Sequence, residues 1–144
     1  MTTKLSISYT WSDAWLLYAV IMETSAVHGA DLVSIVSHGD CIQHAIFTYE
    51  EISNGLMKLL HGGLIKQDKR LFLPTHKTII AYKKLKSKSI GLLKTQDAIE
   101  KLINKDFSLP MNMTVKPIIT KREYQNSVEK YIKIMQKKVK ALPR

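Results

Sequence analysis

Residues 48–75 read TYEEISNGLMKLLHGGLIKQDKRLFLPT, and this stretch decides the fold. Thr48 and Glu51 have the spacing of a capping box, in which each side chain satisfies a free backbone N–H at the start of a helix. Apolar residues then recur on one helical face, at positions 52, 56, 59 and 60, until Gly62-Gly63 ends the helix. Two short strand-like runs, 64–67 and 70–73, flank Asp68-Lys69. The stretch therefore predicts an amphipathic helix that leads directly into a β-hairpin.

Two more helices are predicted on the N-terminal side of this stretch. Ser12 is placed to cap a first helix over residues 13–26, whose broad apolar face indicates that it is largely buried. Asp31 is placed to cap a shorter second helix, which Gly39-Asp40 is expected to end. After it, Ala45-Ile46-Phe47 is a brief apolar run expected to form a single short strand.

The C-terminal side is also predicted to be helical. Thr75 is placed to cap a fourth helix, and a further helix is expected from about residue 96 to residue 104. Pro110 and Pro117 bracket a segment typical of a linker. Thr120 and Glu123 repeat the capping-box spacing, and they open a long final helix with an apolar stripe along one side.

The order of these elements resembles the winged helix-turn-helix superfamily, in particular bacterial transcription regulators of the MarR-like and PadR-like kind. The residues that carry the resemblance are Leu59-Leu60-His61-Gly62-Gly63-Leu64-Ile65 and Phe72-Leu73-Pro74-Thr75, which look like the end of the recognition helix, the two wing strands and the return. The resemblance covers roughly the first half of the chain. It implies an α+β, mostly helical fold, with a winged-helix domain (three helices plus a β-hairpin wing) at residues 1–86 and a basic helical extension at residues 87–144.

In DNA-binding members of this superfamily the third helix enters the major groove, and the wing contacts phosphates or the minor groove. At 100° per residue, the side of the third helix opposite its apolar face points outward. There Asn54 suits adenine, and Lys58 suits guanine or phosphate. We therefore expect a transcriptional regulator that binds duplex DNA. Its expected groove contacts are Ser53, Asn54, Met57, Lys58 and His61, and its expected phosphate contacts on the wing are Lys66, Lys69 and Arg70.

The net charge of +10 is unevenly distributed along the chain. Residues 1–74 carry five basic and seven acidic groups, a net charge of −2, whereas residues 75–144 carry seventeen and five, a net charge of +12. A basic chain favours a polyanionic partner. Glu50 and Glu51 argue the other way, because they lie where a recognition helix approaches the DNA backbone. The alternative is therefore a winged-helix protein-protein interaction module that does not read DNA.

The final helix has two interpretations. Its lysines suit phosphates or an anionic membrane surface. Packing is the more frequent use of an apolar stripe, so we expect a homodimer through the C-terminal helices and no membrane partner. The residues expected to form the dimer are Tyr124, Val128, Tyr131, Ile132, Met135 and Val139.

Several other functions are disfavoured by the sequence. Cys41 is the only cysteine, so no internal disulfide forms and a cytoplasmic location is expected. The longest apolar run, 14–22, has nine residues, about half of what a membrane-spanning helix needs. His38, Cys41 and His44 have a spacing that suggests metal ligands, but no second pair completes a four-coordinate zinc site. Known catalytic and phosphate-loop motifs are missing, so neither an enzyme nor a cofactor is expected.

Four aromatic residues leave two interpretations open. They can line a small-ligand pocket, as an effector-binding regulator requires, or they can form a plain aromatic core. The sequence therefore names no effector. The residues are Trp11, Trp15, Tyr18 and Tyr49.

Overall fold

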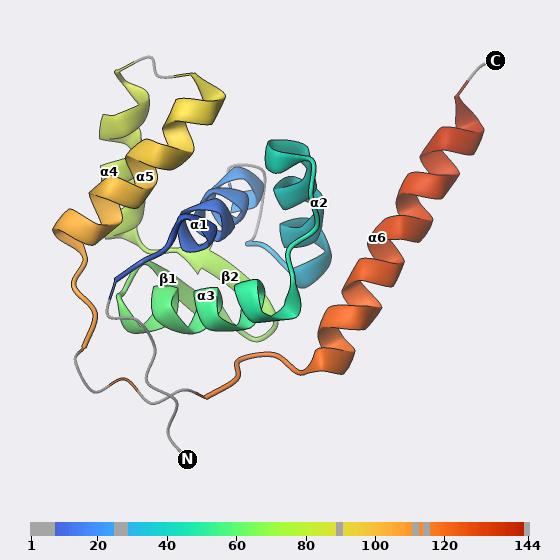
Figure 1. Cartoon of the computed structure of the whole chain (residues 1–144), viewed down its shortest axis with the longest axis horizontal. Coiled ribbons are helices and arrows are strands. Elements are labelled where there is room, and N and C mark those ends of the chain that lie inside the picture. The colour runs from blue at the N-terminus through green and yellow to red at the C-terminus, as the bar shows by residue number, and fades with distance from the viewer. Residues whose placement is uncertain (1–7, 25–28, 89–90, 111–112, 114–115, 143–144) are drawn as a thin grey trace.

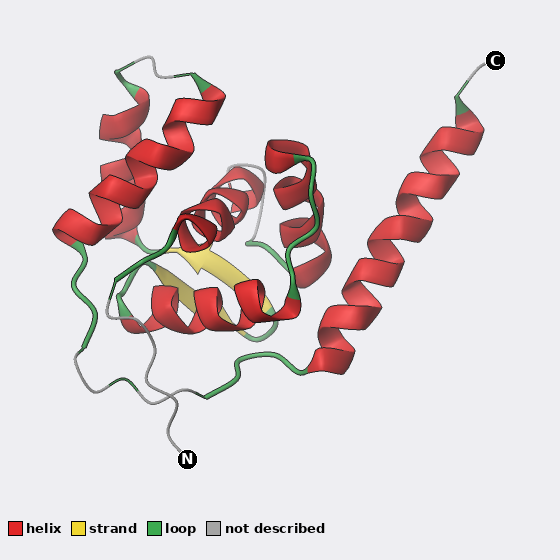
Figure 2. Ribbon diagram, viewed as in Figure 1, coloured by secondary structure: helices red, strands yellow, loops and turns green. Residues whose placement is uncertain are grey.

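The computed structural model describes residues 8–24, 29–88, 91–110, 113 and 116–142. Within these residues the chain forms a mostly helical α+β fold with one two-stranded antiparallel sheet. Figure 2 shows the short hairpin among the helices. The elements are α1 (Trp11–Thr24), α2 (Leu32–Gln43), α3 (Tyr49–His61), β1 (Ile65–Asp68), β2 (Leu71–Pro74), α4 (His76–Lys86), α5 (Leu92–Asp106) and α6 (Lys121–Ala141).

The first helix is buried, as predicted, but it begins earlier than predicted. Thr10 caps α1, because its hydroxyl accepts the N–H of Asp13 at 3.2 Å and its own N–H donates to the Asp13 carboxylate at 2.8 Å. Ser12 lies inside the helix and donates to Glu51 at 2.8 Å, so the predicted cap at Ser12 is wrong. These two hydrogen bonds between Thr10 and Asp13 satisfy backbone N–H groups at the start of α1 that have no partner within the helix.

The second helix has the predicted beginning and a later end. Asp31 accepts the N–H of Ser34 at 2.8 Å, which confirms the cap. The helix passes through Gly39-Asp40 and ends at Gln43, followed by His44 in a left-handed conformation, with φ +56°. Gly39 serves close packing, because a Cβ there would lie 2.2 Å from the ring of Phe47. A glycine that makes room for a ring does not have to end a helix.

The third helix confirms its capping box, with Thr48 and Glu51 each accepting the other's backbone N–H. The predicted strand at residues 45–47 is wrong, because these residues form a loop that buries the Phe47 ring on Trp15, with 3.7 Å between ring centroids. Ala30 instead pairs with Phe72 through two backbone hydrogen bonds of 2.8 Å. Ala30 thus extends the hairpin sheet by one bridge.

The hairpin β1–β2 forms where the sequence predicts it. Its register pairs Asp68 with Leu71, so the two-residue turn is Lys69-Arg70 and not the expected Asp68-Lys69. Lys69 has a φ of +57°, in the left-handed region. The residue at the first central turn position therefore adopts a backbone conformation that favours glycine.

The second half of the chain packs on the first half. Thr75 and Thr120 cap α4 and α6 as predicted, and α5 is longer than the predicted segment 96–104. Figure 1 shows α4 and α5 side by side at one end of the molecule, with α6 at the other end beside α2. Ile99, Ile103 and Phe107 are buried in the same cluster as the residues of α1. One hydrophobic core therefore serves both halves.

Candidate nucleic-acid interface

The outward face of α3 is largely covered by other parts of the chain. Ser53, Met57 and Lys58 have exposed fractions of 6, 1 and 4%, so the prediction that they are free to contact DNA is wrong. Asn54 is half-buried and His61 is exposed. Two of the five expected groove contacts therefore remain accessible.

Lys58 is turned toward the start of α1. Its ammonium lies 2.5 Å from the carboxylate of Asp13 and donates to the carbonyl of Ser8 at 3.3 Å. The two charged side chains are 4 and 3% exposed. Removing one charge from such a pair would leave the other buried without a partner, which is energetically costly. Lys58 therefore cannot serve as a phosphate contact in this conformation.

Helical spacing alone did not reveal this contact. Relative to Ile52, Lys58 points to the flank of α3, 240° around the helix at 100° per residue. Whether that flank meets solvent or another helix depends on how α1 approaches. The sequence contained one signal of this contact, the carboxylate of Asp13 in the first turn of the buried helix α1. A buried charge requires a partner, and Lys58 supplies it.

A second cover lies over α3 between α5 and α6. Residues 116–119, here called the covering segment, run along α3 toward α6 (Figure 1). The backbone N–H of Lys116 contacts the Met57 sulfur at 3.1 Å. The carbonyl of Ile119 accepts the Tyr49 hydroxyl at 3.0 Å, and Ile119 itself is buried. The covering segment thus closes the apolar part of the face that was expected to enter the groove.

The hairpin residues have the exposure that phosphate contacts require. Lys66, Lys69 and Arg70 are all exposed, together with Gln67 and Asp68. The Gln67 amide donates to the carbonyl of Lys69 at 3.1 Å and ties the turn together. The three cationic groups therefore project from an ordered hairpin.

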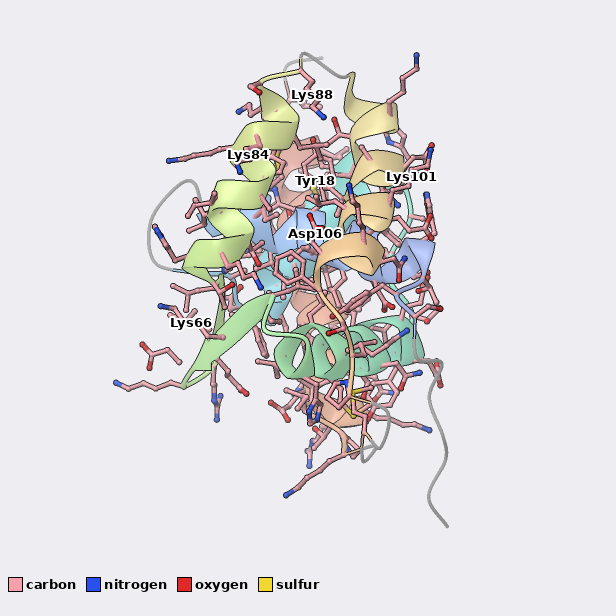
Figure 3. The ribbon with its side chains drawn as sticks, turned by 90° about the vertical axis from the view of Figure 1, so that its left-hand side faces the viewer. Tyr18, Lys66, Lys84, Lys88, Lys101 and Asp106 are labelled. Carbon is pink, nitrogen blue, oxygen red and sulfur yellow. The ribbon has the colours of Figure 1, made fainter. Side chains whose placement is uncertain are left out.

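A neighbouring set of lysines lies on and after α4; from the sequence this basic helix is expected to add non-specific affinity for DNA, with no single lysine named as a contact. Helix α4 contains no acidic residue. In Figure 3, Lys66 on the hairpin and Lys84 on α4 lie on the left of the molecule, and Lys88 lies at its top, beyond the end of α4. The signal in the sequence was the charge of residues 64–88, which include eight basic groups and one acidic group. The hairpin–α4 surface consists of Lys66, Lys69, Arg70, Lys77, Lys83, Lys84, Lys86 and Lys88, all exposed.

The apolar stripe of α6 divides into two parts. The Tyr124 hydroxyl donates to the carbonyl of Phe47 at 2.7 Å, and Tyr131 is 6% exposed and hydrogen-bonded to Asp40. Burial, and then the contact with Asp40, raise the pKa of Tyr131 to about 12. Tyr124, Val128 and Tyr131 therefore pack within the chain, which corrects their expected role in a dimer.

The other part of the stripe remains exposed. Eight large apolar side chains are exposed in the described chain, and five of them lie between Ile132 and Leu142. Ile132, Met135 and Val139 keep the exposure expected of dimer contacts, at 41, 38 and 63%. The C-terminal half of α6 points away from the body of the molecule (Figure 1).

Three further candidate sites are the aromatic cluster, a cleft beside α6 and the possible metal ligands. Trp15 and Tyr18 are buried in the core, which favours the core interpretation of the aromatic cluster. A cleft of about 500 Å³ between the hairpin, α2 and α6 is lined by three basic and three acidic side chains, so its charge selects neither an anion nor a cation. Among the described residues no three His, Cys, Asp or Glu side chains converge as metal ligands.

The described helices include none with the length and apolar character to cross a membrane. Comparison of the chain with models of known protein families, with curated proteins and with solved structures finds no match.

Proposed function

We propose that the chain is a winged-helix protein that binds duplex DNA, with transcriptional regulation as its role. The order α1, the Ala30 bridge, α2, α3 and the β1–β2 hairpin is the order of elements in a winged helix. The observation that carries the proposal is the exposed cationic hairpin of Lys66, Lys69 and Arg70. Lysine and arginine on such a hairpin bind phosphates, and these contacts position a protein on a duplex.

A salt-titrated binding measurement tests the proposal. Full-length protein is expected to bind random duplex DNA at 50 mM salt. With six to ten phosphates neutralised, affinity falls by about 10³–10⁵ between 50 and 200 mM salt. Absence of binding at 50 mM salt would contradict the proposal and favour the interaction module that does not read DNA.

Variants locate the contacts on the hairpin. The triple variant Lys66→Gln, Lys69→Gly, Arg70→Gln is expected to lower the slope of log affinity against log salt by about 3. The matched control is Lys130→Gln, Lys133→Gln, Lys137→Gln on α6, which removes the same charge from another surface. Equal losses in both variants would mean that net charge, rather than the hairpin, determines binding. Lys58 is left unchanged because its ammonium is part of the buried ion pair.

The exposed part of α6 supports a homodimer as a second proposal. Ile132, Met135 and Val139 continue the α2-facing stripe, and they stay exposed among the residues that the structure describes. Both acidic residues of α6, Glu123 and Glu129, lie in its first half, whereas four of its lysines lie after Ile132. An antiparallel pair of α6 helices places carboxylates near lysines, whereas a parallel pair places lysines beside lysines.

The dimer is tested by sedimentation equilibrium of the wild type and of the variant Ile132→Asp, Val139→Asp. The wild type is expected to sediment as a dimer, and the variant as a monomer, because buried unpaired carboxylates oppose association. The matched variant Lys133→Gln, Lys137→Gln changes the other side of α6 and is expected to remain dimeric. A monomeric wild type at 100 μM would contradict this proposal.

A further inference from the structure

We infer that the protein holds duplex DNA by its phosphates across the hairpin–α4 surface and binds any sequence with similar affinity. This inference rests on the proposed function and specifies its substrate class. It has two parts, which are the location of the phosphate contacts and the absence of base reading by α3.

The charge of the hairpin–α4 surface supports the location. Residues 64–88 carry eight basic groups and one acidic group, a net charge of +7. All eight basic side chains are exposed. The eleven residues of α4 extend about 16 Å at 1.5 Å per residue, so the helix continues the cationic hairpin over several phosphate spacings.

The lysines of this surface are available for an external anion. The ion pairs of the described residues are Lys58–Asp13 and His38–Glu23, and neither includes a residue of the hairpin–α4 surface. Lys77 has a further contact within the described part of the chain, with its ammonium 5.1 Å from the centroid of the Phe107 ring. A phosphate backbone would therefore not have to displace an internal carboxylate from these groups.

The face of α3 supports the second part of the inference. Base reading in the major groove pairs Arg or Lys with guanine, Asn or Gln with adenine, and Asp or Glu with cytosine. Lys58 is buried in its ion pair and Glu51 is held in the capping box. This leaves the half-buried Asn54 and the exposed Glu50 as the side chains of these types on α3. Each such contact discriminates between bases by about 5–160-fold, whereas specific binding is typically about 10³–10⁷-fold tighter than nonspecific binding. The accessible residues of α3 therefore fall short of a sequence-specific site.

The covering segment reinforces this conclusion. With Met57 closed beneath the backbone of Lys116, α3 lacks a free face broad enough to lie on base edges. Glu50 and His61, near the two ends of the helix, are exposed. Glu50 carries a charge that opposes approach to the backbone, since its carboxylate would face phosphates.

A panel of unrelated duplexes of one length tests sequence independence in the full-length protein. Dissociation constants at 100 mM salt are expected to agree within about tenfold, and Asn54→Ala is expected to change none of them by more than about threefold. A duplex selected from a random library that binds more than about 10³-fold more tightly would overturn the inference. A preference of more than tenfold for single-stranded DNA or for RNA of equal length would overturn the duplex assignment.

Two quadruple variants test the location. Lys83→Gln, Lys84→Gln, Lys86→Gln, Lys88→Gln removes the charges on and just after α4, and its matched control is Lys133→Gln, Lys137→Gln, Lys138→Gln, Lys140→Gln on α6. The first variant is expected to reduce the salt slope by about 3–4, at about 0.9 per phosphate contact, and the control by less than 1. An equal reduction in both variants would overturn the assignment to the hairpin–α4 surface.

The outcomes separate this inference from the proposal beneath it. If the wild type fails to bind any duplex at 50 mM salt, DNA binding itself is rejected. If it binds with a strong sequence preference, DNA binding stands and the phosphate-only mode is rejected. Unfolding temperatures of both quadruple variants within a few degrees of the wild type ensure that a lost affinity is not a lost fold.

Discussion

The ion pair between Lys58 and Asp13 shows how a single contact determines which side of α3 is available to a partner. Both charges are buried, and the Asp13 carboxylate also accepts the N–H of Thr10 at the start of α1. The pair joins the middle of α3 to the first turn of α1. A residue expected to reach outward to DNA thereby becomes part of the interior.

The variant Lys58→Met is expected to lose about 3–5 kcal/mol of unfolding free energy, because it leaves a buried carboxylate without its partner. Adding Asp13→Asn removes that charge while keeping an acceptor for Thr10, and it is expected to restore part of the loss. Urea unfolding of the wild type, the single variants and the double variant measures the coupling. A Lys58→Met protein as stable as the wild type would show that the pair is not buried in solution.

Tyr131 makes stability depend on pH in the alkaline range. Its pKa is raised from 10.0 to about 12 by burial and then by Asp40, so the folded state holds the phenolic proton more tightly than the unfolded state. This contribution is fully present below about pH 10 and is lost as pH rises through about 12. Urea unfolding at pH 9 and 11.5 is expected to show a smaller loss in Tyr131→Phe than in the wild type. An unchanged loss would assign the dependence to other groups, such as Tyr9 and Tyr18, whose pKa values burial also raises to about 12.

Lys69 occupies a backbone position that favours glycine, with a φ of +57°. Lys69→Gly is expected to raise the unfolding free energy by about 0.5–1 kcal/mol, because the left-handed conformation costs glycine least. The neighbouring turn residue Arg70 does not have a positive φ, so Arg70→Gly removes the same charge without this gain. Thermal unfolding of both variants distinguishes them. Equal melting temperatures would argue against the turn at Lys69-Arg70.

At the scale of elements, close approach between α2 and the loop before α3 depends on one glycine. The Trp15 indole donates to the carbonyl of Gly39 at 3.0 Å, and the Phe47 ring stacks on Trp15 and occupies the space that a Cβ of Gly39 would need. Gly39→Val is expected to lose about 1–3 kcal/mol, because the new side chain collides with the Phe47 ring. Gly91→Val is the matched control, since a Cβ there meets no atom within 4 Å. Near-UV circular dichroism should report the displaced aromatic stack in the first variant only.

The elements themselves were largely predictable from local signals. The capping residues Thr48, Thr75 and Thr120 each begin a helix, because a cap is set by residues within one turn. The strand predicted at residues 45–47 does not form, because the structure of this segment depends on residues far away in the sequence. An apolar run does not say whether its side chains pair with a strand or enter a core, and Phe47 entered the core beside Trp15.

The candidate site was less predictable than the helices, because exposure depends on distant segments. Lys66, Lys69 and Arg70 are exposed as expected, since a short hairpin leaves its tip in solvent. Met57 is closed by the backbone of Lys116, 59 positions later in the chain. Helical periodicity specifies the side of a helix and does not specify what lies against that side.

At the scale of the whole molecule, the covering segment determines which methionines a dissolved oxidant can reach. Met57 is 1% exposed and Met135 is 38% exposed. Mild treatment with hydrogen peroxide is therefore expected to oxidise Met135 and leave Met57 intact, as measured by mass spectrometry of peptides. Tyr49→Phe removes the hydroxyl bond to Ile119 and is expected to increase oxidation of Met57. Rapid oxidation of Met57 in the wild type would show that the cover is open in solution.

The late position of this cover along the chain has a consequence for synthesis. A ribosome that adds about 5–20 residues per second completes Met57 about 3–12 s before it reaches Lys116. During that interval Met57 has been made and the segment that covers it has not. Translation that stops between these two residues would release a polypeptide with Met57 uncovered, and such products are expected to be captured by chaperones or to aggregate.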